Sequence, residues 1–215
     1  MCNYFDNNVP TENLEKEFKK VFTIENEIVR AEQINGFAHD PLPIIQDDVI
    51  EEFVVGSWGI SAPWIRSGDK KALLPLNARL ETIEEKKNFK NNVSNRCVIP
   101  VNAFYEWRWL DPKGRSKEKN KISVAPNSIF SLGAIYFIDK NGKLSFSICT
   151  TEANDLMSYI HNTKKRMPII LPLGKENSWL DPKNSLSEFT YPNYDPELKT
   201  VTVEEGFKEY IPSLF

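Results

Sequence analysis

The chain has 215 residues, of which 40% are hydrophobic and 12% aromatic, and its formal net charge at pH 7 is −3. Because burial efficiency rises with chain length, this is enough for one domain over residues 1–215, and the composition excludes a chain that is disordered throughout. No stretch reaches the ~20 apolar residues of a membrane helix, and the first residues form neither a basic nor an apolar leader, so we expect a cytoplasmic protein. A negative net charge excludes non-specific coating of nucleic acid but is compatible with a local basic groove.

The first part of the chain predicts a helix followed by strands. Residues 11–22 begin with Thr and Glu and carry apolar side chains on one face, which is typical of a capped amphipathic helix packed on a sheet. Short β-branched runs interrupted by Pro and Gly predict strands at 27–34, 42–45 and 49–58. Residues 81–92 are polar and are predicted to be helical.

The rest of the chain is rich in strand patterns. The predicted strands are residues 97–99, 103–109, 122–125, 129–138, 144–150, 168–171 and 199–203, with a hairpin turn at 139–142. Helices are predicted at 152–161 and 175–180. The polar run 111–120 is predicted to be a solvated loop, with a phosphate-contacting basic loop as the alternative. Together these elements predict a single α+β domain with a strand-rich centre.

Cysteine and histidine usage argues against disulfides and metal. Cys2, Cys97 and Cys149 form no spaced pair, so a disulfide framework has no support. His39 and His161 lie far apart, and neither has a second Cys or His at metal-site spacing. We therefore expect neither a metal nor another cofactor.

Cys2 follows the initiator Met, and a small second side chain generally permits removal of that Met. Removal would leave a 1,2-aminothiol, which captures an aldehyde in two steps: the amine forms a Schiff base and the thiol closes it to a five-membered thiazolidine. An α-amine, with an ordinary pKa of about 8, keeps a useful neutral fraction near physiological pH. The alternative is that Cys2 lies at a mobile chain end without a role.

Two further side chains are candidates for proton transfer. Glu106 lies in an apolar and aromatic run, where a carboxylate is partly desolvated and suited to exchanging protons, unless strand alternation places it on the solvent face. His161 ends a predicted helix and precedes a basic segment. It is either a cation at a helix end or a general acid beside an anion-binding loop.

Polar and aromatic residues in the first half are candidates for ligand contacts. Asn77 can cap a turn, and Arg79 can bind a carboxylate or a phosphate. Trp58 and Trp64 flank Gly and Pro residues. They are either core residues or a platform on which an unpaired base stacks.

Six motifs occur in order along the chain. They are Cys2 behind the initiator Met, Trp58-Gly59-Ile60 with Pro63-Trp64, Asn77-Ala78-Arg79-Leu80-Glu81-Thr82, Arg96-Cys97-Val98-Ile99-Pro100, Phe104-Tyr105-Glu106-Trp107, and His161 ahead of Arg166-Met167-Pro168-Ile169-Ile170-Leu171. This order, which runs from residue 2 to about residue 172, resembles the SOS-response-associated peptidase (SRAP) family. Members of that family form covalent crosslinks with abasic sites in single-stranded DNA.

The resemblance implies an α+β domain with a barrel-like, mostly antiparallel central sheet flanked by helices. It also implies a positively charged groove for single-stranded DNA that ends at the mature N-terminus. By matching motif, Cys2 is the nucleophile and Asn77 holds the N-terminus and the opened sugar. Glu106 shuttles protons, and His161 is the partner acid or base.

The DNA contacts implied by the resemblance are Arg79 and Arg166 on backbone phosphates, with Trp58 and Trp64 as candidate stacking residues. An acidic protein can bind DNA with a few cations that face a groove, because covalent capture rather than charge makes the complex permanent. The expected partner is single-stranded DNA with abasic sites, bound by a monomer that associates with the nucleoid and with neither a membrane nor a metal.

Three positions depart from the family pattern. Asn3 and Tyr4 stand where many members have Gly and Arg, so a phosphate contact from that Arg is absent. Segment 162–165 lengthens the connection from His161 to Arg166. Residues 173–215 match no motif and are given no role.

Two other functions stay open beside abasic-site crosslinking. A cysteine peptidase with Cys2 as acyl nucleophile would turn over protein substrates, whereas a crosslinker is consumed. A non-covalent single-stranded DNA-binding module would bind intact and abasic strands equally. Removal of its own initiator Met and weak lyase activity, through β-elimination of the Schiff base, are expected to accompany crosslinking.

Overall fold

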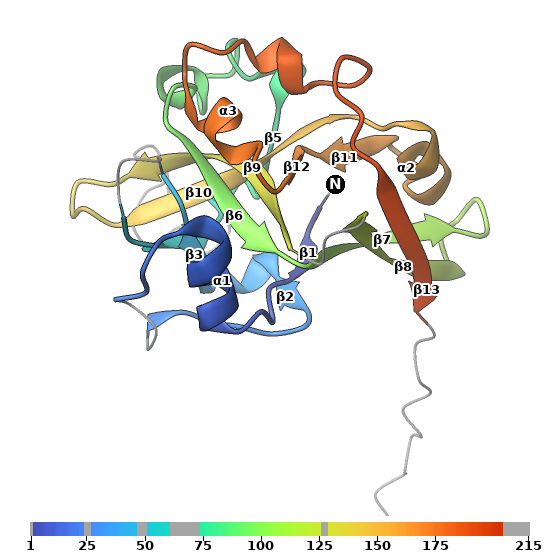
Figure 1. Cartoon of the computed structure of the whole chain (residues 1–215). Helices are drawn as coiled ribbons and strands as arrows, with labels where there is room; N and C mark the ends of the chain where they lie inside the picture. The colour runs from blue at the N-terminus through green and yellow to red at the C-terminus, as the bar shows by residue number, and fades with distance from the viewer. Residues whose placement is uncertain (1, 24–26, 47–50, 61–73, 126–128, 204–215) are drawn as a thin grey trace, which may run out of the picture.

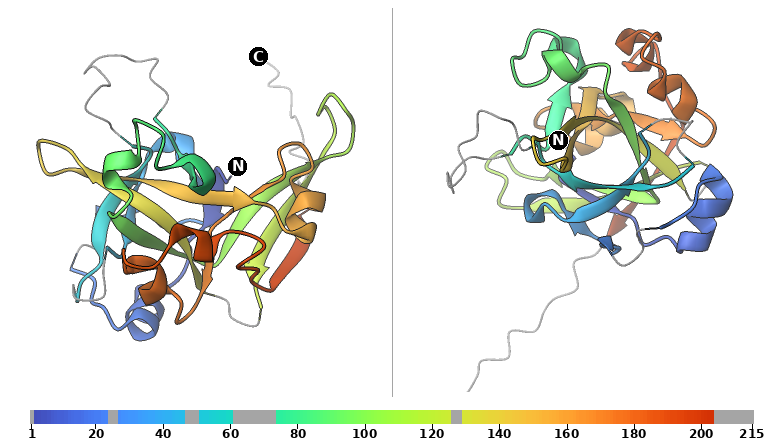
Figure 2. Two further views of the ribbon diagram at one scale, coloured as in Figure 1. Left: turned by 90° about the horizontal axis from the view of Figure 1, so that it is seen from above. Right: turned by 90° about the vertical axis from the view of Figure 1, so that its left-hand side faces the viewer.

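The computed structural model describes residues 2–23, 27–46, 51–60, 74–125 and 129–203. Two sheets share one apolar core, with short helices at the periphery (Figures 1 and 2). The five-stranded sheet has the order β13-β8-β7-β1-β2. Its strands are β1 (Tyr4–Asp6), β2 (Ile34–Asn35), β7 (Ala103–Trp109), β8 (Lys117–Val124) and β13 (Leu198–Val203).

The second sheet has eight strands and the central order β12-β9-β10-β4-β3, with β11 and β5 on β10 and β6 on β9. Its strands are β3 (Pro41–Ile44), β4 (Val54–Trp58), β5 (Asn77–Arg79), β6 (Arg96–Val101), β9 (Phe130–Ile138), β10 (Leu144–Glu152), β11 (Arg166–Pro168) and β12 (Ile170–Pro172). Its ladders are antiparallel except where β10 pairs with β4 and β5. The expected antiparallel character is therefore seen, together with two parallel pairs.

The barrel-like closure that we expected is not confirmed. The two sheets are separate, and neither forms a closed barrel. Among the described residues, the pairing at the β3 edge is the isolated bridge between Ile45, which follows β3, and Val98 of β6. One bridge does not make a ladder, so the sheet is not closed by continuous pairing.

The helices are few and short. They are α1 (Thr11–Phe18), α2 (Asp155–Ile160) and α3 (Glu176–Leu180), with 3₁₀ turns η2 (Gly36–Ala38), η3 (Leu80–Thr82), η4 (Lys90–Asn92) and η5 (Leu186–Phe189). Side chains of α1 and α3 join a second apolar cluster with residues of β6, β9 and β10. None of the helices in the described ranges is long and apolar enough to cross a membrane.

Several predicted boundaries were wrong for local reasons. The helix predicted at 11–22 ends at Phe18, because Lys19 adopts a left-handed conformation with φ of 53°, and it has no side-chain cap. The strand predicted at 27–34 is reduced to β2, and the helix predicted at 81–92 is two 3₁₀ turns. Residues 49 and 50 of another predicted strand lie outside the described residues.

The loop predicted at 111–120 is also shorter than expected, because β8 already begins at Lys117. Its lysines alternate with inward residues, so a run that looks uniformly polar is a strand with two faces. Lys119 faces Trp107 across the β7–β8 ladder, and its ammonium lies 5.8 Å from that ring. The predicted strand 103–109 and the hairpin turn at 139–142 are confirmed.

Candidate functional site

The N-terminal segment is anchored inside a sheet. β1 pairs with β2 on one side and with β7 on the other. Phe5 stacks on Trp58 with ring centroids 4.8 Å apart, and the buried Asp6 forms an ion pair with Lys121 at 2.7 Å. A chain end is usually mobile because little holds it. Here two ladders, a ring contact and an ion pair hold the residues that follow Cys2.

Cys2 is completely buried, which contradicts the alternative of a mobile chain end. Its Sγ lies 3.8 Å from the carbonyl oxygen of Tyr4. Burial, and then the negative charge of Glu106, raise the pKa of the Cys2 thiol. The thiol is therefore protonated at neutral pH and needs a nearby base before it can act as a nucleophile.

Glu106 lies on the inner face of the five-stranded sheet. Strand alternation places it on the same face of β7 as the buried Phe104, and Glu106 itself is 6% exposed. The solvent-face alternative is therefore wrong. Glu106 lies close enough to Cys2 and to His161 for its charge to raise the pKa of each of them.

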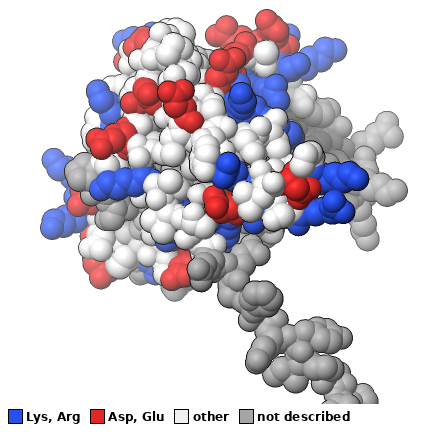
Figure 3. All heavy atoms as spheres, turned by 90° about the vertical axis from the view of Figure 1, so that its right-hand side faces the viewer, with Lys and Arg blue, Asp and Glu red and all other residues white. Residues whose placement is uncertain are grey.

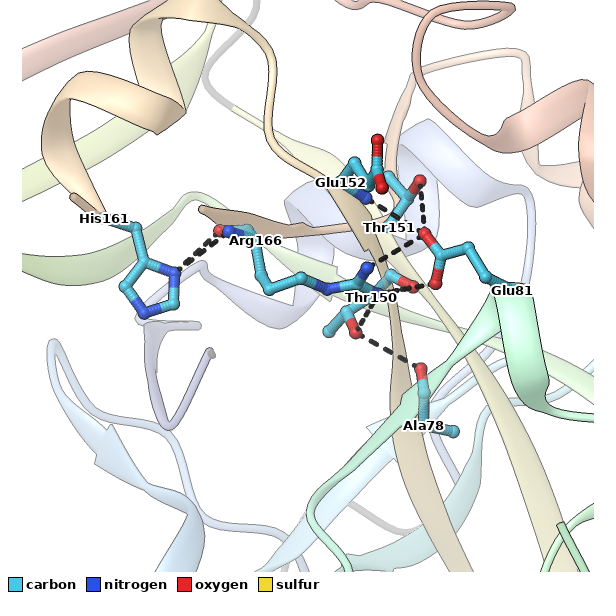
Figure 4. A network of polar contacts seen from close by, with 7 residues as sticks. All are labelled: Ala78, Glu81, Thr150, Thr151, Glu152, His161 and Arg166. Atoms are coloured by element: carbon cyan, nitrogen blue, oxygen red, sulfur yellow. Dashed lines mark hydrogen bonds and ion pairs between the residues drawn. The ribbon is translucent and has the colours of Figure 1, made fainter. Parts of the chain in front are cut away.

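His161 is buried at the C-terminal end of α2, which packs on β7. Its Nδ1 lies 2.9 Å from the carbonyl oxygen of Arg166 and 3.3 Å from the backbone nitrogen of the same residue (Figure 4). The shorter contact favours a proton on Nδ1, which leaves Nε2 as the basic nitrogen. Burial lowers the pKa of His161, although Glu106 opposes this, so the imidazole is neutral at pH 7 and can accept a proton.

Asn77 connects the second sheet to the chain start. From β5 its Nδ2 donates to the carbonyl oxygen of Cys2 at 2.9 Å and to Oδ1 of Asn3 at 3.3 Å. Its Oδ1 is buried and accepts no hydrogen bond within the described part of the chain. A buried acceptor of this kind is costly unless a ligand or water donates to it. Asn77 therefore offers one acceptor beside Cys2.

Arg79 and Arg166 have different surroundings. Arg79 is exposed on β5, two residues after Asn77. Arg166 is buried, and its guanidinium makes a two-pronged contact with Glu81, at 2.9 and 2.8 Å (Figure 4). It also donates to the carbonyl oxygen and the hydroxyl of Thr150, at 2.8 and 3.1 Å. The structure does not support Arg166 as a phosphate contact, because the side chain is buried and both terminal nitrogens of its guanidinium bind Glu81 and Thr150, while its buried Nε has no partner among the described residues.

The network of Arg166 has a structural role. Arg166 lies on β11, and its side chain binds Thr150 of β10 and Glu81 in the turn after β5. These contacts hold together the segments that carry His161 and Asn77. Sequence reasoning missed Glu81 as the partner, although it lies inside the quoted motif Asn77–Thr82. The signal available in the sequence was the acidic Glu81 close behind the strand that carries Asn77 and Arg79.

We expect replacement of Glu81 by Gln to lower stability at pH 7 by about 1–2 kcal/mol, because it leaves the buried Arg166 without its carboxylate. Although burial raises it, hydrogen bonds from Arg166 and Thr151 and the charge of Arg166 hold the pKa of Glu81 below its ordinary value. The wild-type contribution is therefore present above about pH 4.3 and is lost as the pH falls through the lowered pKa. Thermal melts at pH 7 and near pH 3 measure this.

The difference in stability between Glu81→Gln and the wild type should become smaller as the pH falls from 7 to about 3. Glu84→Gln is the matched control, because Glu84 is an exposed carboxylate in the same segment. A difference that stays constant with pH, or an equal effect of Glu84→Gln, contradicts the assigned network.

The structure decides between a core role and a base-stacking role for Trp58, but not for Trp64. Trp58 is completely buried, and its Nε1 donates to the carbonyl oxygen of Leu76 at 2.9 Å. Its assignment as a stacking platform for a base is therefore wrong; it is a core residue that holds Phe5. Trp64 lies outside the described residues. The described residues hold no group of three or more His, Cys, Asp or Glu that could bind a metal ion.

Charged side chains of both signs are mixed on one face of the molecule (Figure 3). On the face over α2 and the nearby strand ends, Lys and Arg side chains are interspersed with Asp and Glu (Figure 3). The described residues form no continuous basic patch in the view of Figure 3, so a polyanion held on this face would contact individual side chains.

Comparison with known proteins gives two kinds of relative. The chain is 37% identical over 149 residues to the abasic site processing protein YoqW of Bacillus subtilis, and 36% identical over 153 residues to YoaM of the same organism, described in the same words. These alignments cover 67% and 69% of this chain, and 64% and 65% of those proteins. The chain thus spans slightly less than two thirds of the length of these relatives.

Solved structures share the fold. A protein from Bacteroides thetaiotaomicron superposes with a TM-score of 0.80 at 29% identity, covering 95% of this chain and 93% of that one. A protein from Bordetella bronchiseptica gives a TM-score of 0.74 at 22% identity, covering 94% and 100%. The family model for the SOS response associated peptidase (SRAP) matches residues 1–208. Together with the buried cluster at Cys2, this match assigns the chain to the SRAP family.

Proposed function

We propose that this protein captures abasic sites in single-stranded DNA by forming a thiazolidine through Cys2 after loss of Met1. The observation that carries the proposal is the burial of Cys2 next to an anchored strand, within the electrostatic reach of Glu106, whose charge also acts on His161. The names of the Bacillus relatives support abasic-site processing as the chemistry.

The proposed reaction begins at the sugar. An abasic deoxyribose is mostly a closed hemiacetal, and Glu106 moves the proton that opens it to the aldehyde. The α-amine of Cys2 adds to the aldehyde carbon, and loss of one water gives a Schiff base. Asn77 holds this end of the chain through the carbonyl oxygen of Cys2, and its Oδ1 accepts from the amine or from a sugar hydroxyl.

Ring closure is the second step. Sγ of Cys2 adds to the imine carbon, the thiol proton leaves to His161 or Glu106, and the imine nitrogen gains a proton. No oxidant is needed, and the net product beside the thiazolidine is one water. Because burial keeps the thiol protonated, the amine reacts first and the neutral His161 is the natural acceptor for the thiol proton. β-Elimination from the open Schiff base would give weak lyase activity.

The raised pKa of Cys2 also weighs against a peptidase that turns over other proteins. Cysteine proteases use a thiolate made available by a lowered thiol pKa, whereas burial moves the thiol of Cys2 in the opposite direction. Peptidase activity on other proteins is therefore not proposed, and the removal of Met1 from the chain itself is proposed as a maturation step. Arg79 is proposed to contact a backbone phosphate, because it is exposed on the strand that carries Asn77.

Intact-mass spectrometry of the purified protein, with and without an abasic oligonucleotide, tests the proposal. We expect the free protein to lack Met1, and the mixture to show a new mass equal to protein plus oligonucleotide minus one water. An intact oligonucleotide with a normal base is the matched control and should add no covalent mass. Crosslinking by protein that retains Met1, or binding of both strands without a covalent product, would contradict the thiazolidine.

A further inference from the structure

Arg108 is a cation beside the candidate site that the assignments above do not use. It lies two residues after Glu106 on β7, so its side chain is on the same face of the strand. Its guanidinium lies 3.9 Å from the ring centroid of Tyr159. Tyr159 belongs to α2, the helix that ends at His161. Arg108 thus connects the strand of the proposed proton shuttle to the helix of its partner.

The donors of Arg108 are not consumed by the fold. Within the described part of the chain it makes no hydrogen bond or ion pair, and its Nε is buried without an acceptor. Glu118 faces it across the β7–β8 ladder, yet the two form no ion pair. Arg166, by contrast, directs its guanidinium at a carboxylate and a threonine.

The contact with the Tyr159 ring orients the guanidinium of Arg108 but does not supply acceptors for its hydrogen-bond donors. Tyr159 is 56% exposed, so the pair lies at the surface, where a cation–π contact contributes little to stability. Stacking does restrict the guanidinium plane and leaves its donors open at the edge. A planar fork held in this way matches the oxygens of a phosphate, which Arg binds with two parallel hydrogen bonds.

The position of Arg108 mirrors that of Arg79. β5 carries Asn77 and, two residues later, Arg79; β7 carries Glu106 and, two residues later, Arg108. Two residues along a strand correspond to about 7 Å. Each of the two strands therefore carries a polar residue of the candidate site and an arginine two residues farther along the chain. A DNA strand that places its lesion at Cys2 has a phosphodiester on either side of the lesion.

We propose that Arg108, stacked on Tyr159, binds the phosphodiester on one side of the abasic site, opposite the phosphodiester held by Arg79. The proposal rests on the function proposed above, and it gives Arg108 the phosphate contact that was assigned from sequence to Arg166. Arg108 is a binding and positioning residue, and it takes no part in proton transfer.

The test measures equilibrium binding of the full chain to a single strand that contains a tetrahydrofuran abasic analogue, which has no aldehyde and cannot crosslink. We expect Arg108→Gln to weaken binding about 3–10-fold and to reduce the slope of log affinity against log salt by about 0.7, the value for one phosphate contact on a single strand. Arg108→Lys should keep the slope and lose part of the affinity, because it retains the charge but not the stacked fork.

Arg115→Gln is the matched control, because its side chain is 79% exposed in the β7–β8 connection and lies 4.0 Å from Asp111. It should leave affinity and slope unchanged. Tyr159→Leu alters an exposed ring, so it is expected to fold, and it should weaken binding about threefold. An unchanged slope in folded Arg108→Gln, wild-type affinity of Tyr159→Leu, or an equal loss in Arg115→Gln would overturn the proposal.

Failure of this inference is distinguishable from failure of the proposed function. The tetrahydrofuran strand reports phosphate contacts alone, whereas mass spectrometry with a true abasic strand reports covalent capture. Wild-type protein that crosslinks, combined with an unchanged slope in Arg108→Gln, overturns only the phosphate assignment. Absence of any crosslink by wild-type protein overturns the proposed function and leaves the measured slopes as they are.

Discussion

Replacement of Cys2 by Ala is expected to abolish the stable crosslink to abasic DNA completely, the largest effect of any single substitution. The variant keeps an N-terminal amine but has no sulfur to close the ring, so a Schiff base can form but stays open to hydrolysis and β-elimination. Denaturing gels after reaction with an abasic oligonucleotide measure the stable product. Addition of borohydride before denaturation measures the trapped Schiff base.

Cys2→Ser separates the two steps further, because it replaces sulfur with the weaker hydroxyl nucleophile in a side chain of similar size. We expect borohydride-trappable product without a thiazolidine. Cys97→Ala and Cys149→Ala are the matched controls, since both thiols are completely buried on other strands, Cys97 on β6 and Cys149 on β10. If either control abolishes crosslinking while its melting curve shows a folded protein, Cys2 loses its assignment as the nucleophile.

The strands that could be predicted from sequence are those whose pattern is dictated by burial. The runs at 103–109 and 129–138 are apolar over most of their length, and they form β7 and β9. β8 was missed in part because three lysines cover one face while Asn120 and Ile122 face inward. A strand with one charged face resembles a loop until its partner strand is known.

The residues of the candidate site were predicted by matching motifs, but the contacts among them could not be predicted from the sequence. Cys2, Asn77 and Glu106 come from positions far apart in the chain. The β1–β7 ladder places the chain start beside the strand of Glu106, and a hydrogen bond from Asn77 connects β5 to Cys2. The sequence shows that Arg166 follows His161 but not that Glu81 neutralises it. Whether an arginine pairs with an internal carboxylate is decided by tertiary contacts, which is why the sequence did not reveal the pairing of Arg166 with Glu81 or the contact of Arg108 with Tyr159.

Glu106→Gln is expected to slow crosslinking about 10²- to 10⁴-fold while leaving affinity for the tetrahydrofuran strand nearly unchanged. The amide has almost the same shape as the carboxylate but cannot exchange a proton, so it removes the proposed general acid and base while keeping the volume of the side chain. Single-turnover kinetics with an abasic oligonucleotide, at protein concentrations above the dissociation constant, measure the chemical step apart from binding.

Glu176→Gln is the matched control for this substitution. Glu176 is 7% exposed, against 6% for Glu106. It is the first residue of α3, in another part of the fold, and accepts a hydrogen bond from Ser131 at 3.1 Å. Both substitutions remove a buried carboxylate, so both are expected to alter the melting temperature. Only Glu106→Gln should alter the rate constant of folded protein, because only Glu106 lies in electrostatic contact with Cys2 and His161. An unaltered rate in folded Glu106→Gln, or an equal slowing in Glu176→Gln, would remove Glu106 from the reaction.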